Sequence, residues 1–206
     1  MVESLKAYRG SGNKVSFRLW FRVTGVLASL LLASVVVRAE PGSAKAFEFQ
    51  LLSVGVRSRV GEKRVLGEEQ PDSFRVYDAI ASFQLPWVRD LPSGWNLDGR
   101  LLTSAGVLRG ADKTALAVSA IPVLALEWPE RFVLDGGIGL AALSRHRYAQ
   151  QDFGGHLQFA LSAGLGVAVY RNIWLGYRYQ HYSDASVYGS NTIGADFHML
   201  ELNYRF

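Results

Sequence analysis

The chain has 206 residues, with 22 lysines and arginines against 18 acidic residues and no cysteine. Without cysteine, neither disulfides nor thiolate chemistry can contribute. Apart from one apolar run near the N-terminus, the sequence has no stretch of roughly 18 apolar residues, so an integral membrane form would have to be a β-barrel.

The N-terminal segment has the pattern of a secretory signal peptide. Basic residues precede an apolar run over residues 23–37, and Val37 and Ala39 supply the spacing that signal peptidase prefers. A membrane anchor is the alternative, but the run is shorter than the roughly 20 residues that a spanning helix needs. We therefore predict a signal peptide over residues 1–39 and one domain over residues 40–206.

Removal of this segment would change the net charge. Residues 1–39 contain six of the 22 basic residues and one of the 18 acidic residues, which leaves 16 basic and 17 acidic residues. The remaining chain is close to neutral, and the pI of about 9.4 of the whole chain is no argument for nucleic-acid binding.

A segment of about ten residues with alternating polarity, bounded by turn residues, recurs along the rest of the chain. This repetition is typical of strands in a membrane barrel. Eight strands are predicted, over residues 47–60, 74–85, 95–108, 116–126, 132–143, 157–169, 173–183 and 196–206.

The sixth segment alternates most clearly. Apolar side chains from Leu157 to Val169 face one way, while Gln158, Gly164 and Gly166 face the other. Glycines on the inner face suit a narrow barrel whose lumen is filled by side chains.

The connections also fit a barrel, because short turns and long polar loops alternate along the chain. Residues 171–172 predict a tight turn, whereas 61–73, 145–155 and 184–195 are long and polar. The 85–93 connection is an exception, because it is longer than the other turns expected at the same end of the barrel. Four tryptophans lie beside the short turns, as in an aromatic belt at a membrane interface: Trp87, Trp95, Trp128 and Trp174.

We therefore predict an all-β fold, an eight-stranded antiparallel transmembrane β-barrel. A soluble β-sandwich is the alternative, since it would alternate too. The signal peptide, the clustered aromatic residues and the terminal Phe206, which closes an apolar period-two run, favour the barrel.

A base, a hydroxyl and a carboxylate fall on one face of the last two segments. Side chains two apart share a face of a strand, so His181 and Ser183 lie with the apolar stripe that begins at Leu175. Counting back from Phe206, Asp196 lies on the terminal apolar stripe. All three should thus lie at one height, on the lipid-facing side of adjacent strands.

These residue types suit nucleophilic catalysis. A serine hydroxyl is a poor nucleophile unless a base accepts its proton, and the base needs a carboxylate to orient it. We interpret Ser183 as the nucleophile, His181 as the general base and then acid, and Asp196 as the orienting group. The expected substrate is a lipid. From spacing alone, an interfacial polar rim without activity would explain the same residues.

The other titratable residues have structural interpretations. His198 could compete with His181 for Asp196, but we expect it to pack at the membrane interface. His146 and His156 are expected to be solvated beside an outer loop. Inward-pointing charges are expected to form a salt-bridge network in the lumen, namely Asp98, Arg100, Asp135 and Arg178.

A distinctive motif lies near the end of the chain. It reads Tyr179-Gln180-His181-Tyr182-Ser183-Asp184-Ala185, followed by Asn191 and then by Gly194-Ala195-Asp196. The motif resembles that of the lipid A 3-O-deacylase (PagL) family, which has the form His-Tyr-Ser-Asn-Ala, an Asn/Gly-containing loop and Gly-x-Glu. With two upstream runs, 120–124 and 136–141, the resemblance spans about residues 74–206.

This resemblance implies an outer-membrane barrel of a Gram-negative bacterium, with a Ser-His-acid site that faces the outer leaflet. Members hydrolyse the ester at position 3 of lipid A and release a 3-hydroxy fatty acid, with no metal or other cofactor. Carried over, the triad is His181, Ser183 and Asp196, the set that the shared face also indicates. Homodimers are known in the family, so a homodimer is an implied assembly.

Two residues depart from the family motif. The acid is Asp196 where the family usually has Glu, and Asp184 replaces the Asn thought to help form the oxyanion hole. A carboxylate cannot donate a hydrogen bond to an oxyanion. The remaining oxyanion-hole candidates are therefore the backbone N–H groups from Asp184 to Ser186. Alternatively, Asp184 is protonated or turned away, or activity is weak.

The sequence thus supports a serine esterase that removes the 3-O-linked acyl chain of lipid A in lipopolysaccharide. A noncatalytic barrel, structural or adhesive, is the alternative. A lipid acyltransferase would keep its site inside the barrel, which the outward position of Ser183 does not fit. Four loop cations could contact lipid A phosphates: Lys63, Arg64, Arg145 and Arg147.

Overall fold

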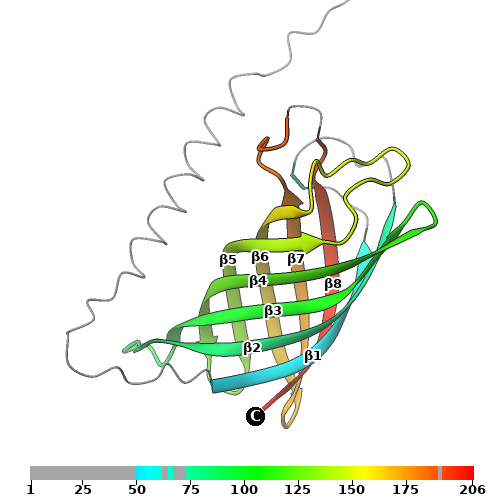
Figure 1. Cartoon of the computed structure of the whole chain (residues 1–206). Coiled ribbons are helices and arrows are strands. Elements are labelled where there is room, and N and C mark those ends of the chain that lie inside the picture. Colours follow the sequence, from blue (N-terminus) through cyan, green and yellow to red (C-terminus); the bar gives the residue numbers. More distant parts are fainter. Residues whose placement is uncertain (1–49, 62–64, 67–72, 190–191) are drawn as a thin grey trace, which may run out of the picture. The chain divides into compact units, whose positions relative to one another are not determined.

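The computed structural model describes residues 50–61, 65–66, 73–189 and 192–206, and the predicted signal peptide lies outside them. Within these residues the chain forms eight strands (Figure 1). They are β1 (Gln50–Gly61), β2 (Phe74–Asp90), β3 (Asn96–Gly110), β4 (Lys113–Trp128), β5 (Phe132–Leu143), β6 (Leu157–Tyr170), β7 (Ile173–Ser183) and β8 (Ala195–Arg205).

Each strand pairs antiparallel with the next, and β8 pairs with β1 to close the barrel. The predicted eight-stranded antiparallel barrel is therefore confirmed. The β6–β7 turn and the C-terminus lie at one end, and the β5–β6 and β7–β8 loops at the other (Figure 1). Closure leaves no strand edge unpaired, which a bilayer requires. Among the described residues, no helix is long and apolar enough to cross a membrane.

Two connections are shorter than the strand ranges predicted from the sequence imply. The 85–93 connection is mostly strand, because β2 continues to Asp90 after a register shift between Gln84 and Val88. Between β3 and β4 the turn has only two residues, Ala111 and Asp112, with φ of 47° and 56°. Two consecutive positive φ values give a tight hairpin that matches the strand twist.

The outer wall of the barrel is apolar and exposed. Along β4 the exposed side chains alternate with buried ones from Leu116 to Leu124, and β6 follows the same pattern from Leu157 to Val167. Leu116 has 66% of its surface exposed. Because exposed large apolar side chains occur on seven of the eight strands, all but β3, this wall suits the hydrocarbon of a membrane.

The lumen contains a buried network of charges, as predicted. Arg178 donates from Nε to Glu201 at 2.7 Å and from its two Nη atoms to Asp135 at 2.5 and 2.9 Å. Arg100 pairs with Asp98 at 2.6 Å. Each of these side chains is at least 88% buried, so the pairs must remain together to offset the loss of hydration.

One tryptophan of the predicted aromatic belt lies elsewhere. Trp174 is buried in the lumen, with the Arg205 guanidinium 4.3 Å from its ring centroid. Its position follows from strand parity, because it shares a face with the inward Arg178. Trp87 and Trp128 are exposed, and Trp95 packs edge-on against Trp128 at 5.4 Å.

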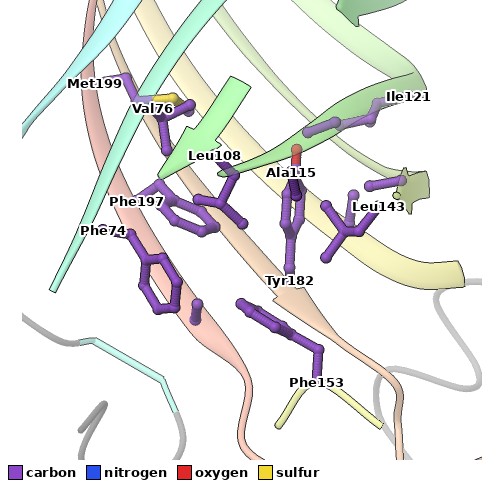
Figure 2. Close-up of a cluster of buried hydrophobic side chains, with 14 of the residues drawn as sticks. Phe74, Val76, Leu108, Ala115, Ile121, Leu143, Phe153, Tyr182, Phe197 and Met199 are labelled. Carbon is purple, nitrogen blue, oxygen red and sulfur yellow. The ribbon is translucent and has the colours of Figure 1, made fainter. Parts of the chain in front are cut away.

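An apolar cluster fills the lumen at the end with the long loops (Figure 2). Phe74 packs against Tyr148 at 4.8 Å and Phe153 at 5.7 Å, and Tyr182 packs against Phe197 at 5.2 Å between ring centroids. Since Tyr182 and Phe197 each follow an outward residue of the predicted triad, the cluster supports the site from within.

Candidate active site

His181 and Asp196 lie opposite each other on neighbouring strands. Their Cα atoms are direct partners in the β7–β8 ladder, and both side chains belong to the outward parity of their strands. The distance from His181 Nδ1 to Asp196 Oδ1 is 2.5 Å. This contact assigns the proton of the neutral ring to Nδ1 and leaves Nε2 as the basic nitrogen.

Asp196 faces outward but has only 3% of its surface exposed. Its Oδ2 accepts hydrogen bonds from the backbone N–H groups of Val65 and Leu66, at 2.6 and 2.8 Å, and its Oδ1 accepts one from the Tyr179 hydroxyl at 2.9 Å. Sequence reasoning missed these donors, and 130 residues separate the loop from Asp196. The carboxylate is therefore fixed from two sides.

Ser183 follows His181 on the outward face at the end of β7, where it pairs with Phe159. Within the described part of the chain, its hydroxyl makes no hydrogen bond to His181. Both side chains are partly exposed, so a substrate can reach them. Catalytic hydrogen bonds often shorten only when the substrate binds, and the shared face leaves Nε2 and the Ser183 hydroxyl free to approach.

Gly194 makes room for the imidazole. A Cβ atom at this position would lie 2.9 Å from His181 Cε1 and 3.2 Å from Nε2. The Gln151 side chain donates to the carbonyl oxygens of Ile193 and Gly194, at 2.5 and 3.2 Å, and so anchors this strand entry to the β5–β6 loop. Sequence reasoning recorded Gly194 only as part of the motif and missed Gln151.

The Asp184 side chain is turned into its own loop and is buried. Its carboxylate accepts hydrogen bonds from the N–H of Ser186 at 3.1 Å, the N–H of Tyr188 at 3.1 Å and the Thr192 hydroxyl at 2.8 Å. Of the two oxyanion-hole candidates, Ser186 thus has its amide occupied by Asp184. The amides of Asp184 and Ala185 make no hydrogen bond within the described residues.

A comparison with protein families matches residues 76–205 to the lipid A 3-O-deacylase (PagL) model. The chain belongs to the PagL family. Within it, the lipid A deacylase PagL of Bordetella bronchiseptica is 34% identical over 88 residues, which cover 43% of this chain and 49% of that protein. The matched segment thus spans about half the length of this relative.

The fold comparison agrees with the family assignment. The crystal structure of the outer membrane enzyme PagL superimposes with a TM-score of 0.61, at 22% identity, over 75% of this chain and 99% of that chain. At this identity the likeness concerns the fold alone. The sequence-based resemblance to the PagL family is confirmed.

The remaining histidines of this PagL-family chain have other partners. His198 lies on the outward face two residues below Asp196, and its Nδ1 is 2.5 Å from the Tyr177 hydroxyl. His146 and His156, expected to be solvated, stack edge-on at 4.9 Å. His146 Nδ1 also lies 3.2 Å from Asp152.

The β5–β6 loop carries a partly exposed acid, Asp152. Partial burial alone would raise the pKa of its carboxyl, but the Gly154 N–H, His146 and Arg147 bind it and keep the pKa below its ordinary value. Of the predicted phosphate contacts, Arg145 and Arg147 are exposed on this loop. Lys63 and Arg64 lie outside the described residues.

A groove of about 570 Å³ lies on the outer wall below the candidate site. Ser58 is among its lining residues and is paired with Leu200 on β8 and with Tyr77 on β2. Leu200 is four residues from Asp196, about 13 Å along an extended strand. The outward-facing residues that line the groove are Val56, Ser58, Tyr77, Ala79, Leu175, Leu200 and Leu202.

No group of three or more His, Cys, Asp or Glu side chains among the described residues is arranged to bind a metal ion.

Proposed function

We propose that this chain is an outer-membrane serine esterase that hydrolyses the 3-O-linked acyl chain of lipid A. The observation that carries the proposal is the 2.5 Å contact between His181 and Asp196 on the apolar outer wall, one outward position from Ser183. Membership of the PagL family supports lipid A as the substrate.

In this mechanism, Ser183 Oγ attacks the carbonyl carbon of the ester while His181 Nε2 accepts the hydroxyl proton. Asp196 stabilises the imidazolium that forms and keeps its ring oriented. The tetrahedral intermediate collapses when His181 returns the proton to the sugar oxygen, which leaves. Water, activated by the same imidazole, then hydrolyses the acyl-enzyme and releases the fatty acid.

The backbone amides that begin the β7–β8 loop would stabilise the oxyanion. Ala185 has a φ of 52°, and its N–H and that of Asp184 are not used by other groups in the described structure. Backbone donors fixed in this way stabilise a developing oxyanion without reorganisation. The Asp184 carboxylate instead organises the loop that presents them.

The outer-wall groove offers a place for the acyl chain. Its lining is mainly apolar, and the small side chains of Ser58 and Ala79 leave the wall hollowed below the site. An acyl chain whose ester lies at Ser183 would run down the wall, from the interface toward the hydrocarbon.

This function implies a location and an orientation. The end with the long loops would face the cell exterior, so that His181, Ser183 and Asp196 lie at the outer leaflet, where lipopolysaccharide is found. Residues 1–39 would direct export as a signal peptide. A homodimer is compatible with the family resemblance.

The test is hydrolysis by the purified, folded protein in detergent with hexa-acylated lipid A. The parent protein should release one fatty acid from position 3, and Ser183→Ala should release none. Thr103→Ala, a hydroxyl removed from the β3 wall far from the site, is the matched control and should retain activity. If the folded parent protein left lipid A intact, the noncatalytic barrel would be the better account.

A further inference from the structure

The Asp196 carboxylate has an unusual setting for the wall of a membrane barrel. It lies among outward-facing side chains, where an ionised group is costly unless it is paired. Two backbone amides of the β1–β2 loop, the Tyr179 hydroxyl and His181 all donate to it. These contacts are more than the orientation of one imidazole requires.

We propose that Tyr179 and the backbone amides of Val65 and Leu66 are positioning groups of the triad, which fix the Asp196 carboxylate against His181. The inference rests on the proposed function and assigns part of the catalytic machinery to β1–β2, far away in the sequence. None of these groups is proposed to touch the substrate.

The hydrogen-bond donors are distributed over the two carboxylate oxygens of Asp196. Val65 and Leu66 bind Oδ2 at 2.6 and 2.8 Å, so rotation of the carboxylate about its axis would break both bonds. Tyr179 binds Oδ1, the oxygen that also accepts the proton of His181. A short acid can serve because Asp196 and His181 are direct partners in the ladder.

The Tyr179 hydroxyl also affects the charge that His181 experiences. A hydrogen bond to Oδ1 draws negative charge away from the imidazole. Without it, Oδ1 would interact more strongly with the imidazolium that forms during the reaction. The titratable groups near Asp196 on this face are Tyr177, Tyr179 and His181 on β7 and His198 on β8. His198 bonds to the Tyr177 hydroxyl.

Two results should follow for Tyr179→Phe. Loss of the orienting bond should lower kcat about 10-fold with KM unchanged, the effect usual for a partner that orients a ligand or base. The acidic limb of the pH–rate profile should move to higher pH. Tyr177→Phe is the matched control, because it removes the same hydroxyl from the same strand face without touching Asp196.

Proline substitutions test the role of the two loop amides. Val65→Pro and Leu66→Pro each remove one N–H, whereas Val65→Ala and Leu66→Ala shorten the side chain and keep the N–H. The proline variants should lose activity about 10-fold or more, and the alanine variants should not. Heat-modifiable mobility on gels identifies the variants that still form the barrel.

The readout is the rate at which a fluorophosphonate labels Ser183, measured across pH on the folded proteins, beside kcat and KM for lipid A. Labelling reports the triad whatever the natural ester is, so failure of the lipid A assay alone would leave this inference standing. It is overturned if Tyr179→Phe labels at the parent rate with the parent pH profile. It is also overturned if both proline variants label as the alanine variants do, or if Ser183 of the parent protein does not react.

Discussion

The Asp184→Asn substitution restores the residue type that the family motif has after the serine. The motif alone would predict a gain in activity, through an added oxyanion donor. The structure predicts the opposite. Asp184 uses both carboxylate oxygens inside its loop, with Ser186 and Thr192 on Oδ1 and Tyr188 on Oδ2.

An asparagine can replace only one of these oxygens. With its carbonyl in the Oδ1 position, its NH₂ group would face the Tyr188 N–H, two donors in contact. A hydrogen bond to a charged acceptor contributes about 1.5–3 kcal/mol. The loop should therefore lose stability by about this amount, which makes its transient opening roughly 10- to 150-fold more frequent.

The assay is amide hydrogen exchange at Tyr188, followed by mass spectrometry on the folded barrel. In Asp184→Asn, exchange at Tyr188 should be roughly 10- to 150-fold faster. The value of kcat should fall, because the loop that holds the Ala185 amide in position is less stable. Thr192→Val, which removes a neutral donor from the same carboxylate, should have a smaller effect. If Asp184→Asn instead raised kcat with unchanged exchange at Tyr188, this interpretation of Asp184 would be wrong.

Three further results are expected. Gly194→Ala should lower kcat at least 10-fold while the barrel remains folded, because the new methyl group would lie 2.7 Å from the Tyr182 carbonyl oxygen and 2.9 Å from His181 Cε1, so that the β7 backbone and the imidazole must shift; activity equal to the parent would contradict this. Arg178→Ala should destabilise the barrel in urea by about 3–5 kcal/mol, since it removes both hydrogen bonds to Asp135 and leaves Glu201 with the longer contact to Arg57 at 3.6 Å, whereas the exposed Arg147→Ala should change stability little. The depressed pKa of Asp152 predicts that its contribution to loop stability is present above about pH 4 and is lost as pH falls through its folded-state pKa; hydrogen exchange in the β5–β6 loop that is unchanged down to pH 2 would refute it.

Strand alternation predicted most of the fold. The outward stripe of β6 and the inward charges such as Arg178 follow from a period of two and lie as expected. The extension of β2 beyond Leu85 was missed, because a register shift near Pro86 interrupts the alternation on which the prediction depends. Trp174 was assigned to the belt by its place in the chain, although its parity pointed inward.

The candidate site was predictable where it depends on neighbouring strands. Parity and a shared hairpin placed His181 opposite Asp196, and the structure has them in direct register. The Val65 and Leu66 amides could not be inferred, because their position depends on how a loop far away in the sequence folds over the wall. The role of Asp184 depends likewise on the path of its own loop.

Catalysis by Ser183 on the lipid-facing wall is the central claim, and its most direct test is the mass of lipid A from outer membranes that carry this protein. The account predicts the loss of one 3-hydroxyacyl chain with the parent protein and intact lipid A with Ser183→Ala, at equal levels of folded barrel. Deacylated lipid A in both samples would contradict Ser183 as the nucleophile, and intact lipid A in both would contradict the esterase itself.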